Sequence, residues 1–318
     1  MLERSAHVGR AAARNRGDTM KSLSSSAVLL STLLLLTGTC CERETVAPEH
    51  APNPAASDSA VITDHRSTDL AVIPARWIDS AKANLCIAYG HTSHGSQLVS
   101  GMTGLVGFRG ALYEFDGAGS SGALELRDTP FQGASDLGNP DRTAWEAATR
   151  TYLIAHPEVN VVIWSWCGQV SSAAADDITT YLDLMGGLER DYPGVRFVYM
   201  TGHLDGSGLT GNLHLRNEQI RTFCKVNRKA LYDFADIESY NPDGAYFGGR
   251  IPNDNCDYDG DGDGTRENNW AIEWQNSHAG QWYDCSAAHS QPLNGNLKAY
   301  AAWSLWARLA GWDGVASR

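Results

Sequence analysis

Residues 85–98 read LCIAYGHTSHGSQL, and the order of side chains in this stretch predicts a strand that turns directly into a helix. The apolar run Leu85–Ala88 is typical of a buried strand, and residues 97–105, QLVSGMTGL, are typical of a helix. Two histidines and two serines lie between them, namely His91, Ser93, His94 and Ser96. Such a turn indicates either an active-site corner or a loop rich in hydroxyls, since Ser, His and Gly all suit loops.

The same alternation of strand and helix continues along the chain. Helices are expected at residues 75–84, 141–156, 175–192, 215–227 and 294–311, and strands at 160–165, 196–201 and 230–237. Residues 109–140 are rich in glycine and are expected to be irregular, with a small hairpin. Strands that alternate with helices of this length form parallel sheets. The sequence therefore predicts one α/β domain, a three-layer α/β/α sandwich with a mainly parallel sheet.

The N-terminal part of the chain is expected to lie outside this domain. Residues 1–41 resemble a signal peptide or lipoprotein leader, with an upstream extension over residues 1–19 and a short apolar run that ends in TGTCC. Residues 42–67 are rich in Pro, Ala, Ser and charge, which predicts a disordered linker before a domain at residues 68–318. We expect an exported protein, a bacterial cell-envelope lipoprotein or a secreted or periplasmic protein, that touches a membrane only through an N-terminal lipid.

Charge and cysteine content narrow the function further. The net charge of the 318 residues is −12, and so acidic a protein is not expected to bind nucleic acid. Five cysteines follow residue 41, so at least one of them has no partner among the others. Because export permits disulfides, we expect a Cys256–Cys285 bridge, the most economical pairing near the last helix.

Polar clusters follow the predicted strands at the ends where α/β sheets form their ligand crevices. The clusters are His91, Ser93 and His94 after the first strand, Cys167 and Gln169 after the second, His203 and Asp205 after the third, and Asp284 and His289 before the last helix. Four clusters at corresponding positions favour a functional site over four unrelated turns.

Over residues 73–310 this order of elements resembles the SGNH (GDSL-like) hydrolases, of which the chain would be a divergent member. GHTS (90–93) is similar to the family's Gly-Asp-Ser turn, with one extra residue and with His in place of Asp. DCSAAH (284–289) is similar to its Asp-x-x-His segment, with four intervening residues instead of two. The resemblance implies an SGNH/flavodoxin-like fold and a serine esterase without a catalytic metal, often one that deacetylates carbohydrate.

The resemblance also implies a role for each matching residue. Ser93 would be the nucleophile, His289 the base and Asp284 the carboxylate that orients the base. Gly138 and Gln169 would supply the oxyanion hole, where Gln169 stands in place of the family's Asn. The histidines His91, His94 and His203 would line the crevice.

A different chemistry uses the same histidines as metal ligands. His91, His94 and His203 could converge on zinc and make the protein a metal-dependent hydrolase. A His-x-x-His pair on a loop is a weak signal, because histidines scattered on loops are more often unligated.

The loop at residues 254–269, DNCDYDGDGDGTRENN, resembles a calcium-binding loop. Carboxylates at alternate positions followed by glycine are typical of the start of such loops. The candidate Ca²⁺ ligands are Asp257, Asp259, Asp261, Asp263 and Glu267. Without a cation, so many carboxylates would repel one another.

Three tryptophans, Trp270, Trp274 and Trp282, lie between this loop and Asp284. Their rings could stack on the sugars of an acylated oligosaccharide or polysaccharide, or they could pack the long loop onto the domain. The alternative to an esterase, from another class, is a non-catalytic, calcium-stabilised lipoprotein that binds carbohydrate.

Overall fold

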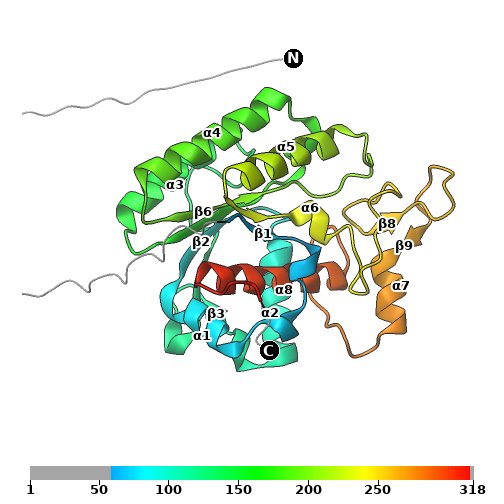
Figure 1. The fold of residues 1–318 in the computed structure, drawn as a ribbon, viewed down its shortest axis with the longest axis horizontal. Coiled ribbons are helices and arrows are strands. Elements are labelled where there is room, and N and C mark those ends of the chain that lie inside the picture. Colours follow the sequence, from blue (N-terminus) through cyan, green and yellow to red (C-terminus); the bar gives the residue numbers. More distant parts are fainter. Residues whose placement is uncertain (1–58, 316–318) are drawn as a thin grey trace, which may run out of the picture. The chain divides into compact units, whose positions relative to one another are not determined.

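A computed structural model describes residues 59–315 (Figure 1), so the predicted leader and most of the predicted linker lie outside the described residues. The seven strands of the main sheet are β1 (Val61–Thr63), β2 (Cys86–Gly90), β3 (Phe115–Asp116), β4 (Leu124–Asp128), β5 (Val161–Trp164), β6 (Arg196–Met200) and β7 (Ala230–Tyr232). A second, two-stranded sheet pairs β8 (Asp257–Tyr258) with β9 (Asn268–Asn269).

The helices cover both faces of the main sheet. They are α1 (Ala75–Asn84), α2 (Ser96–Arg109), α3 (Ala144–Ala155), α4 (Ala175–Asp191), α5 (Asn212–Val226), α6 (Phe234–Ile237), α7 (Trp270–Ser277) and α8 (Pro292–Leu309). One face carries α1, α2 and α8, and the other carries α3, α4 and α5 (Figure 1). The protein is therefore a three-layer α/β/α structure, as expected. No helix within residues 59–315 has the length and apolar character needed to cross a membrane.

Strand order locates the place where a ligand can bind. The order across the sheet is β1-β7-β6-β5-β2-β4-β3, and every neighbouring pair is parallel. Counted along the chain, the five strands from β2 to β7 other than β3 stand in the order 2-1-3-4-5 of flavodoxin-like sheets. The order reverses between β2 and β5, and in open α/β sheets the ligand crevice lies outside the carboxyl ends of the strands at such a point.

The sheet has an apolar core on each face, because successive strand side chains point to opposite sides. In β5, Val161 and Ile163 lie in the core shared with α1, α2 and α8, whereas Val162 and Trp164 lie in the core shared with α3, α4 and α5. Burial on both faces explains why this strand is a continuous apolar run without alternation.

Three of the sequence-based expectations are corrected by the structure. The predicted linker extends too far, because Val61–Thr63 forms β1 at the edge of the sheet beside β7. The predicted hairpin is absent, since β3 and β4 pair in parallel. The predicted strand at 230–237 ends at Tyr232, because Asp233 caps α6 by accepting a hydrogen bond from the backbone N–H of Asp236.

Candidate functional site

Side chains from three strand ends meet at the point where the strand order reverses. Ser93 and His94 follow β2, Cys167 follows β5, and His203 follows β6. A fifth residue, Asp254, lies in the long loop that precedes β8. The clusters after the first three strands therefore do share one site, as the sequence predicts.

One imidazole joins a thiol to a carboxylate in this site. The Sγ of Cys167 lies 3.5 Å from Nδ1 of His94, within hydrogen-bond reach for sulfur. The other ring nitrogen of His94, Nε2, lies 2.9 Å from Oδ2 of Asp254. A nucleophile, a base and a group that orients the base are arranged in this way in enzymes that use covalent catalysis.

The electrostatics of the three groups favour an ionised pair. Burial alone would raise the pKa of Cys167, but hydrogen bonds with Ser93 and His94 outweigh it and leave the pKa below its ordinary value. Burial lowers the pKa of His94, yet its bonds to Asp254 and Cys167 raise it above the ordinary value. Burial likewise raises the pKa of Asp254, and the bond to His94 brings it below the ordinary value. A thiolate beside an imidazolium is the reactive form of a catalytic cysteine.

Ser93, the predicted nucleophile, lies in the site but bonds to the thiol. Its Oγ is 3.4 Å from Sγ of Cys167, and no hydrogen bond joins it to a histidine among residues 59–315. Ser96 begins α2 and donates its hydroxyl to the carbonyl of Ser93 at 2.6 Å. The role of Ser93 as nucleophile stays a prediction.

The predicted base and its carboxylate are not joined. The His289 ring stacks on that of His94, with ring centroids 4.6 Å apart, so His289 does lie at the site. Asp284 is exposed, and within the described part of the chain no hydrogen bond connects it to His289. With four residues between the two, Asp284 lies beside α2 near Gly104 rather than behind the imidazole.

The predicted oxyanion donors are already bonded to a buried carboxylate. Oδ1 of Asp136 accepts the backbone N–H of Gly138 at 2.9 Å and the side-chain amide of Gln169 at 3.0 Å. Oδ2 of the same residue accepts the hydroxyl of Thr92 at 2.5 Å. Gly138 and Gln169 therefore shape the loops around Cys167, with the backbone N–H of Gly138 and one N–H of the Gln169 amide bonded to Asp136.

The histidines predicted to line the crevice divide between its two sides. His91 lies on the β4 side, where its Nε2 is 2.6 Å from Oδ1 of Asp128, and it lines a cavity of about 170 Å³. His94 and His203 lie on the β6 side, with stacked rings 3.6 Å apart. His91 is therefore excluded from the predicted set of three metal-binding histidines.

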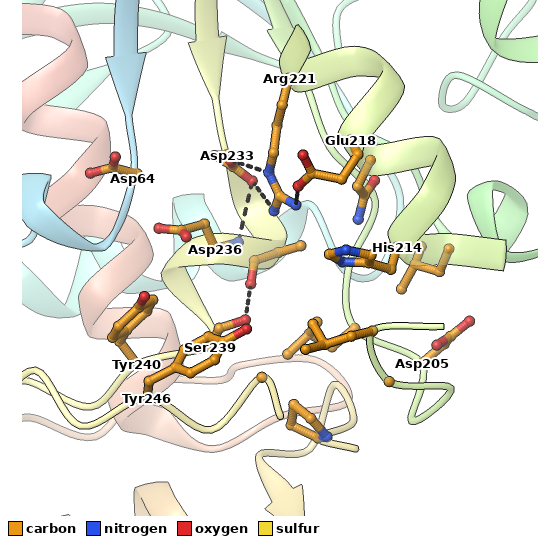
Figure 2. Close-up of a pocket in the computed structure, with 18 of the residues that line it drawn as sticks. Asp64, Asp205, His214, Glu218, Arg221, Asp233, Asp236, Ser239, Tyr240 and Tyr246 are labelled. Atoms are coloured by element: carbon orange, nitrogen blue, oxygen red, sulfur yellow. Dashed lines mark hydrogen bonds and ion pairs between the residues drawn. The ribbon is translucent and has the colours of Figure 1, made fainter. Parts of the chain in front are cut away.

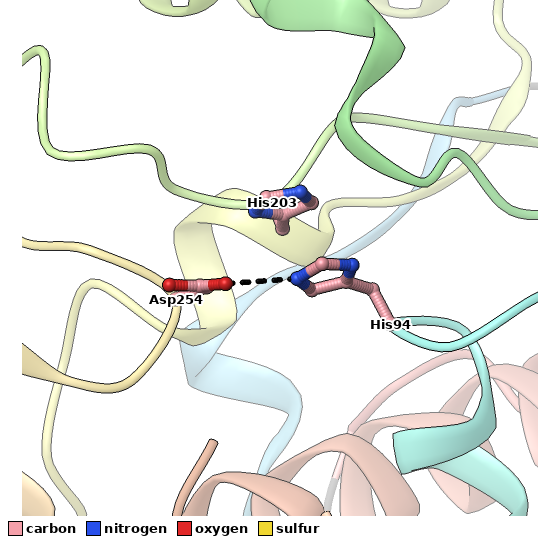
Figure 3. Close-up of side chains that lie close together, drawn as sticks. All are labelled: His94, His203 and Asp254. Carbon is pink, nitrogen blue, oxygen red and sulfur yellow. Dashed lines mark hydrogen bonds and ion pairs between the residues drawn. The ribbon is translucent and has the colours of Figure 1, made fainter. Parts of the chain in front are cut away.

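A three-residue group that could hold a metal forms on the β6 side. The ligand atoms of His94, His203 and Asp254 lie within 4.8 Å of one another (Figure 3). His203 is 8% exposed, and its Nδ1 lies 2.8 Å from the carbonyl oxygen of Leu204. Two imidazoles and one carboxylate are ligands that suit zinc and similar divalent metals.

The acidic loop does bring carboxylates together, but the group starts at Asp259, two residues after Asp257, where the sequence suggests that it starts. The oxygens of Asp259, Asp261, Asp263 and Glu267 lie within 4.8 Å of one another. Asp257 is not among them, because its carboxylate accepts hydrogen bonds from the amides of three asparagines, Asn253, Asn255 and Asn269. The carboxylate ligands that fit Ca²⁺ are thus the four from Asp259 onward.

The three tryptophans pack the loop onto the domain. Trp270 is 1% exposed and stacks on Phe247, and Trp274 is 7% exposed and donates its indole N–H to Asp243 at 3.0 Å. Trp282 is half-buried and donates to the carbonyl of Gln275. Their faces are used in packing, so the structure favours the second of the two roles considered for them.

The expected disulfide is not formed. Cys256 and Cys285 are both free thiols. The Sγ of Cys256 lies 3.5 Å from the hydroxyl of Ser290, whereas the Sγ of Cys285 lies 3.5 Å from the carbonyl of Pro292. The two thiols therefore anchor different positions at the start of α8.

No match was found when the chain was compared with known protein families, with curated proteins and with solved structures. The chemistry of the site therefore rests on its own geometry.

A polar cavity of about 280 Å³ adjoins the site (Figure 2). Leu204 and Asp205, which directly follow His203, line it together with residues of α5 and α6. Its charges are neutralised in pairs, as where Arg221 donates to both carboxylate oxygens of Asp233 at 2.6 and 2.7 Å. The cavity offers room for a polar group next to the segment that follows His203, although His203 itself does not line it.

Sequence reasoning gave no role to two residues that the site depends on. Cys167 had been placed after the second strand, and its position at the reversal of strand order was the available signal. Asp254 is 160 residues from His94 along the chain and lies in a loop with many carboxylates. No local pattern singles it out, and only the folded chain brings it to the imidazole.

Proposed function

We propose that the protein is an exported hydrolase that cleaves ester bonds through a covalent intermediate on Cys167. The observation that carries the proposal is a single imidazole, His94, that contacts the Cys167 thiol through Nδ1 and the Asp254 carboxylate through Nε2. Export rests on the leader predicted in residues 1–41. The ester class rests on the resemblance to SGNH hydrolases, and acylated carbohydrate remains the substrate to try first.

The proposed reaction has two steps. In the first, the thiolate attacks the ester carbonyl, a thioester forms, and the alcohol leaves with the proton held by His94. In the second, water attacks the thioester while His94 takes its proton, and the carboxylic acid and the thiol are released. The positive end of the α2 dipole, which begins at Ser96, favours the negative charge that develops beside it.

The test separates a cysteine from a serine nucleophile. Turnover of a chromogenic acetyl ester and of acetylated polysaccharides should fall by at least about 10³-fold in Cys167→Ala. In Ser93→Ala, which loses one hydrogen bond to the thiol, turnover should fall by no more than about 10-fold. Cys285→Ala removes a half-buried thiol away from His94 and serves as the matched control.

Three results would argue against the proposal. If Ser93→Ala removed activity and Cys167→Ala did not, the serine esterase with His289 as base would be the correct reading. If His289→Ala alone stopped turnover, the base would not be His94. Binding of acylated carbohydrate without turnover would identify the non-catalytic lipoprotein.

We also propose that Ca²⁺ stabilises the acidic loop. Four carboxylates within 4.8 Å of one another, on a loop where every second residue is aspartate, support this role. The loop is joined through β8 and β9 to the segment that carries Asp254. Calcium would therefore act on the site through the position of Asp254.

A further inference from the structure

His203 has a ring nitrogen that no side chain or backbone group satisfies. Its Nδ1 must donate to the carbonyl of Leu204, because a carbonyl oxygen can only accept. Nε2 is therefore the acceptor nitrogen, and it is buried without a hydrogen-bond partner among the described residues. Buried polar atoms in native proteins are nearly always paired, so an unpaired one needs an explanation.

The surroundings of this nitrogen point to a cation. A ring nitrogen of His94, a ring nitrogen of His203 and a carboxylate oxygen of Asp254 lie within 4.8 Å of one another. Nδ1 of His94 contacts the thiol of Cys167, and Nδ1 of His203 contacts the carbonyl of Leu204. Nε2 of His94 contacts Asp254, whereas Nε2 of His203 has no hydrogen-bond partner among the described residues. Histidine ligands of metals are commonly held by such a contact at their second nitrogen.

We infer that His94, His203 and Asp254 bind a divalent transition metal of the zinc type, and that the metal competes with the thiol for His94. The competitive part of the inference rests on the proposed function, whereas the metal site itself does not. Two imidazoles and a carboxylate without a thiolate ligand leave coordination positions open to water.

Competition follows from where the imidazole proton can be. In the thiol enzyme, Nε2 of His94 donates to Asp254 and Nδ1 accepts the proton of Cys167. When a metal occupies Nε2, the Nε2 proton is released to solvent, and the neutral ring keeps only the proton that Nδ1 has taken from Cys167. To pass that proton to the leaving alcohol, His94 would have to become an imidazolate, so it no longer serves as the acid and base of the reaction, and Asp254 no longer orients it.

The stacked rings add a second cost to catalysis. The ring centroids of His94 and His203 are 3.6 Å apart and the ring planes are inclined by 5°, whereas a metal binds in the plane of each imidazole. Metal binding therefore requires the rings to tilt out of the stack. Because His94 also contacts Cys167 through Nδ1, a tilt of its ring moves the base away from the thiol.

The experiment measures metal binding apart from activity. Co²⁺ is titrated in excess Ca²⁺, which keeps the acidic loop occupied, and its visible absorption and binding heat are followed. Wild type and the Cys167→Ala variant should both bind one Co²⁺. His203→Gln should bind it at least about 100-fold more weakly. His91→Gln, which alters a histidine on the other side of the crevice, is the matched control and should bind like wild type.

Activity then tests the competition. Zn²⁺ should inhibit ester turnover of wild type at concentrations near its dissociation constant, and a chelator should restore the rate. Equal Co²⁺ affinity in wild type and His203→Gln, or no binding by Cys167→Ala, would overturn the metal site. A rate that rises with Zn²⁺ would overturn the competition. Metal binding together with full activity in Cys167→Ala would instead contradict the proposed nucleophile and leave the site intact.

Discussion

Two buried polar clusters lie close together in this molecule, and they differ in how completely their atoms are paired. The first, which we call the closed cluster, consists of Lys298, Glu238, Gln97 and Asn294. Nζ of Lys298 donates to all three of the others, at 3.0 Å to Glu238, 3.1 Å to Gln97 and 2.9 Å to Asn294. The second, the open cluster, consists of Cys167, His94, Asp254 and His203, and it leaves one imidazole nitrogen unpaired.

The difference shows which cluster maintains structure and which is built to react. In the closed cluster a fully buried charge pair is compensated by hydrogen bonds, although burial lowers the pKa of Lys298. Its members also hold the loops of the open cluster. Gln97 donates to the carbonyl of Ala288 at 2.6 Å, and Glu238 accepts the backbone N–H of Leu204, next to His203. The closed cluster, whose polar atoms are hydrogen-bonded, thus positions the open cluster, which has an unpaired ring nitrogen.

The largest expected effect is on stability, when the closed cluster is broken. Lys298→Met leaves Glu238 charged and buried without its partner, and the free energy of unfolding should fall by about 3–5 kcal/mol. Urea unfolding followed by tryptophan fluorescence measures it. The double variant Lys298→Met with Glu238→Gln removes the unpaired charge and should recover most of the loss. A loss below about 1 kcal/mol in the single variant would refute the importance of the pair.

The next effect is on turnover, when the open cluster loses its carboxylate. Asp254→Asn should lower ester turnover by about 100-fold or more, because His94 loses the group that orients it, while stability changes little. The matched control is Asp128→Asn, which breaks a similar histidine–carboxylate contact, that of His91, on the other side of the crevice. Equal losses in both variants would mean that Asp254 acts only by holding the fold.

A smaller effect concerns thiol reactivity. At neutral pH, with metals chelated, iodoacetamide should alkylate Cys167 at least about 10-fold faster than Cys285. Burial raises the pKa of Cys285 to about 11, whereas the pKa of Cys167 lies below its ordinary value. A lower pKa means more thiolate at a given pH. As the pH rises, the alkylation rate of Cys167 should therefore level off at a lower pH than the rate of Cys285. Peptide mass spectrometry reads both sites, and similar rates would contradict the ionised pair.

The smallest effect is on the acidic loop. Removal of Ca²⁺ should cost about 1 kcal/mol, or about 2–4 °C in the Tm of a domain of this size. Asp261→Asn should abolish this response to chelation. Asp257→Asn should keep it, since Asp257 lies outside the four carboxylates. If Asp257→Asn abolished the response to chelation and Asp261→Asn kept it, the Ca²⁺ ligands would start at Asp257, as the sequence suggests.

Much of the fold was predictable because its signals are local. The apolar run at residues 85–88 leads into β2, and the helix expected at residues 75–84 is α1. β1 was missed because three residues at a sheet edge gain their stability from β7, far along the chain. Its sequence carries too few apolar residues to stand out from a linker.

Only the location of the site could be predicted from the sequence, and not the contacts between its atoms. Polar residues after β2, β5 and β6 had to meet where the strand order reverses, and they do. Which atoms face one another depends on rotamers and on loops from distant parts of the chain. The contacts of Asp136 with Thr92, Gly138 and Gln169, which engage the expected oxyanion donors, could not be read from residue types.

The edge strand β1 also shows on which side of the sheet the open cluster lies. In a parallel sheet all strands start at one side, and the open cluster lies at the other, beyond their carboxyl ends. β1 is parallel to its neighbour β7, so Val61 lies on the side where the strands start, away from the open cluster. The loops that follow the strands, and not the residues at the start of β1, therefore border the mouth of the crevice.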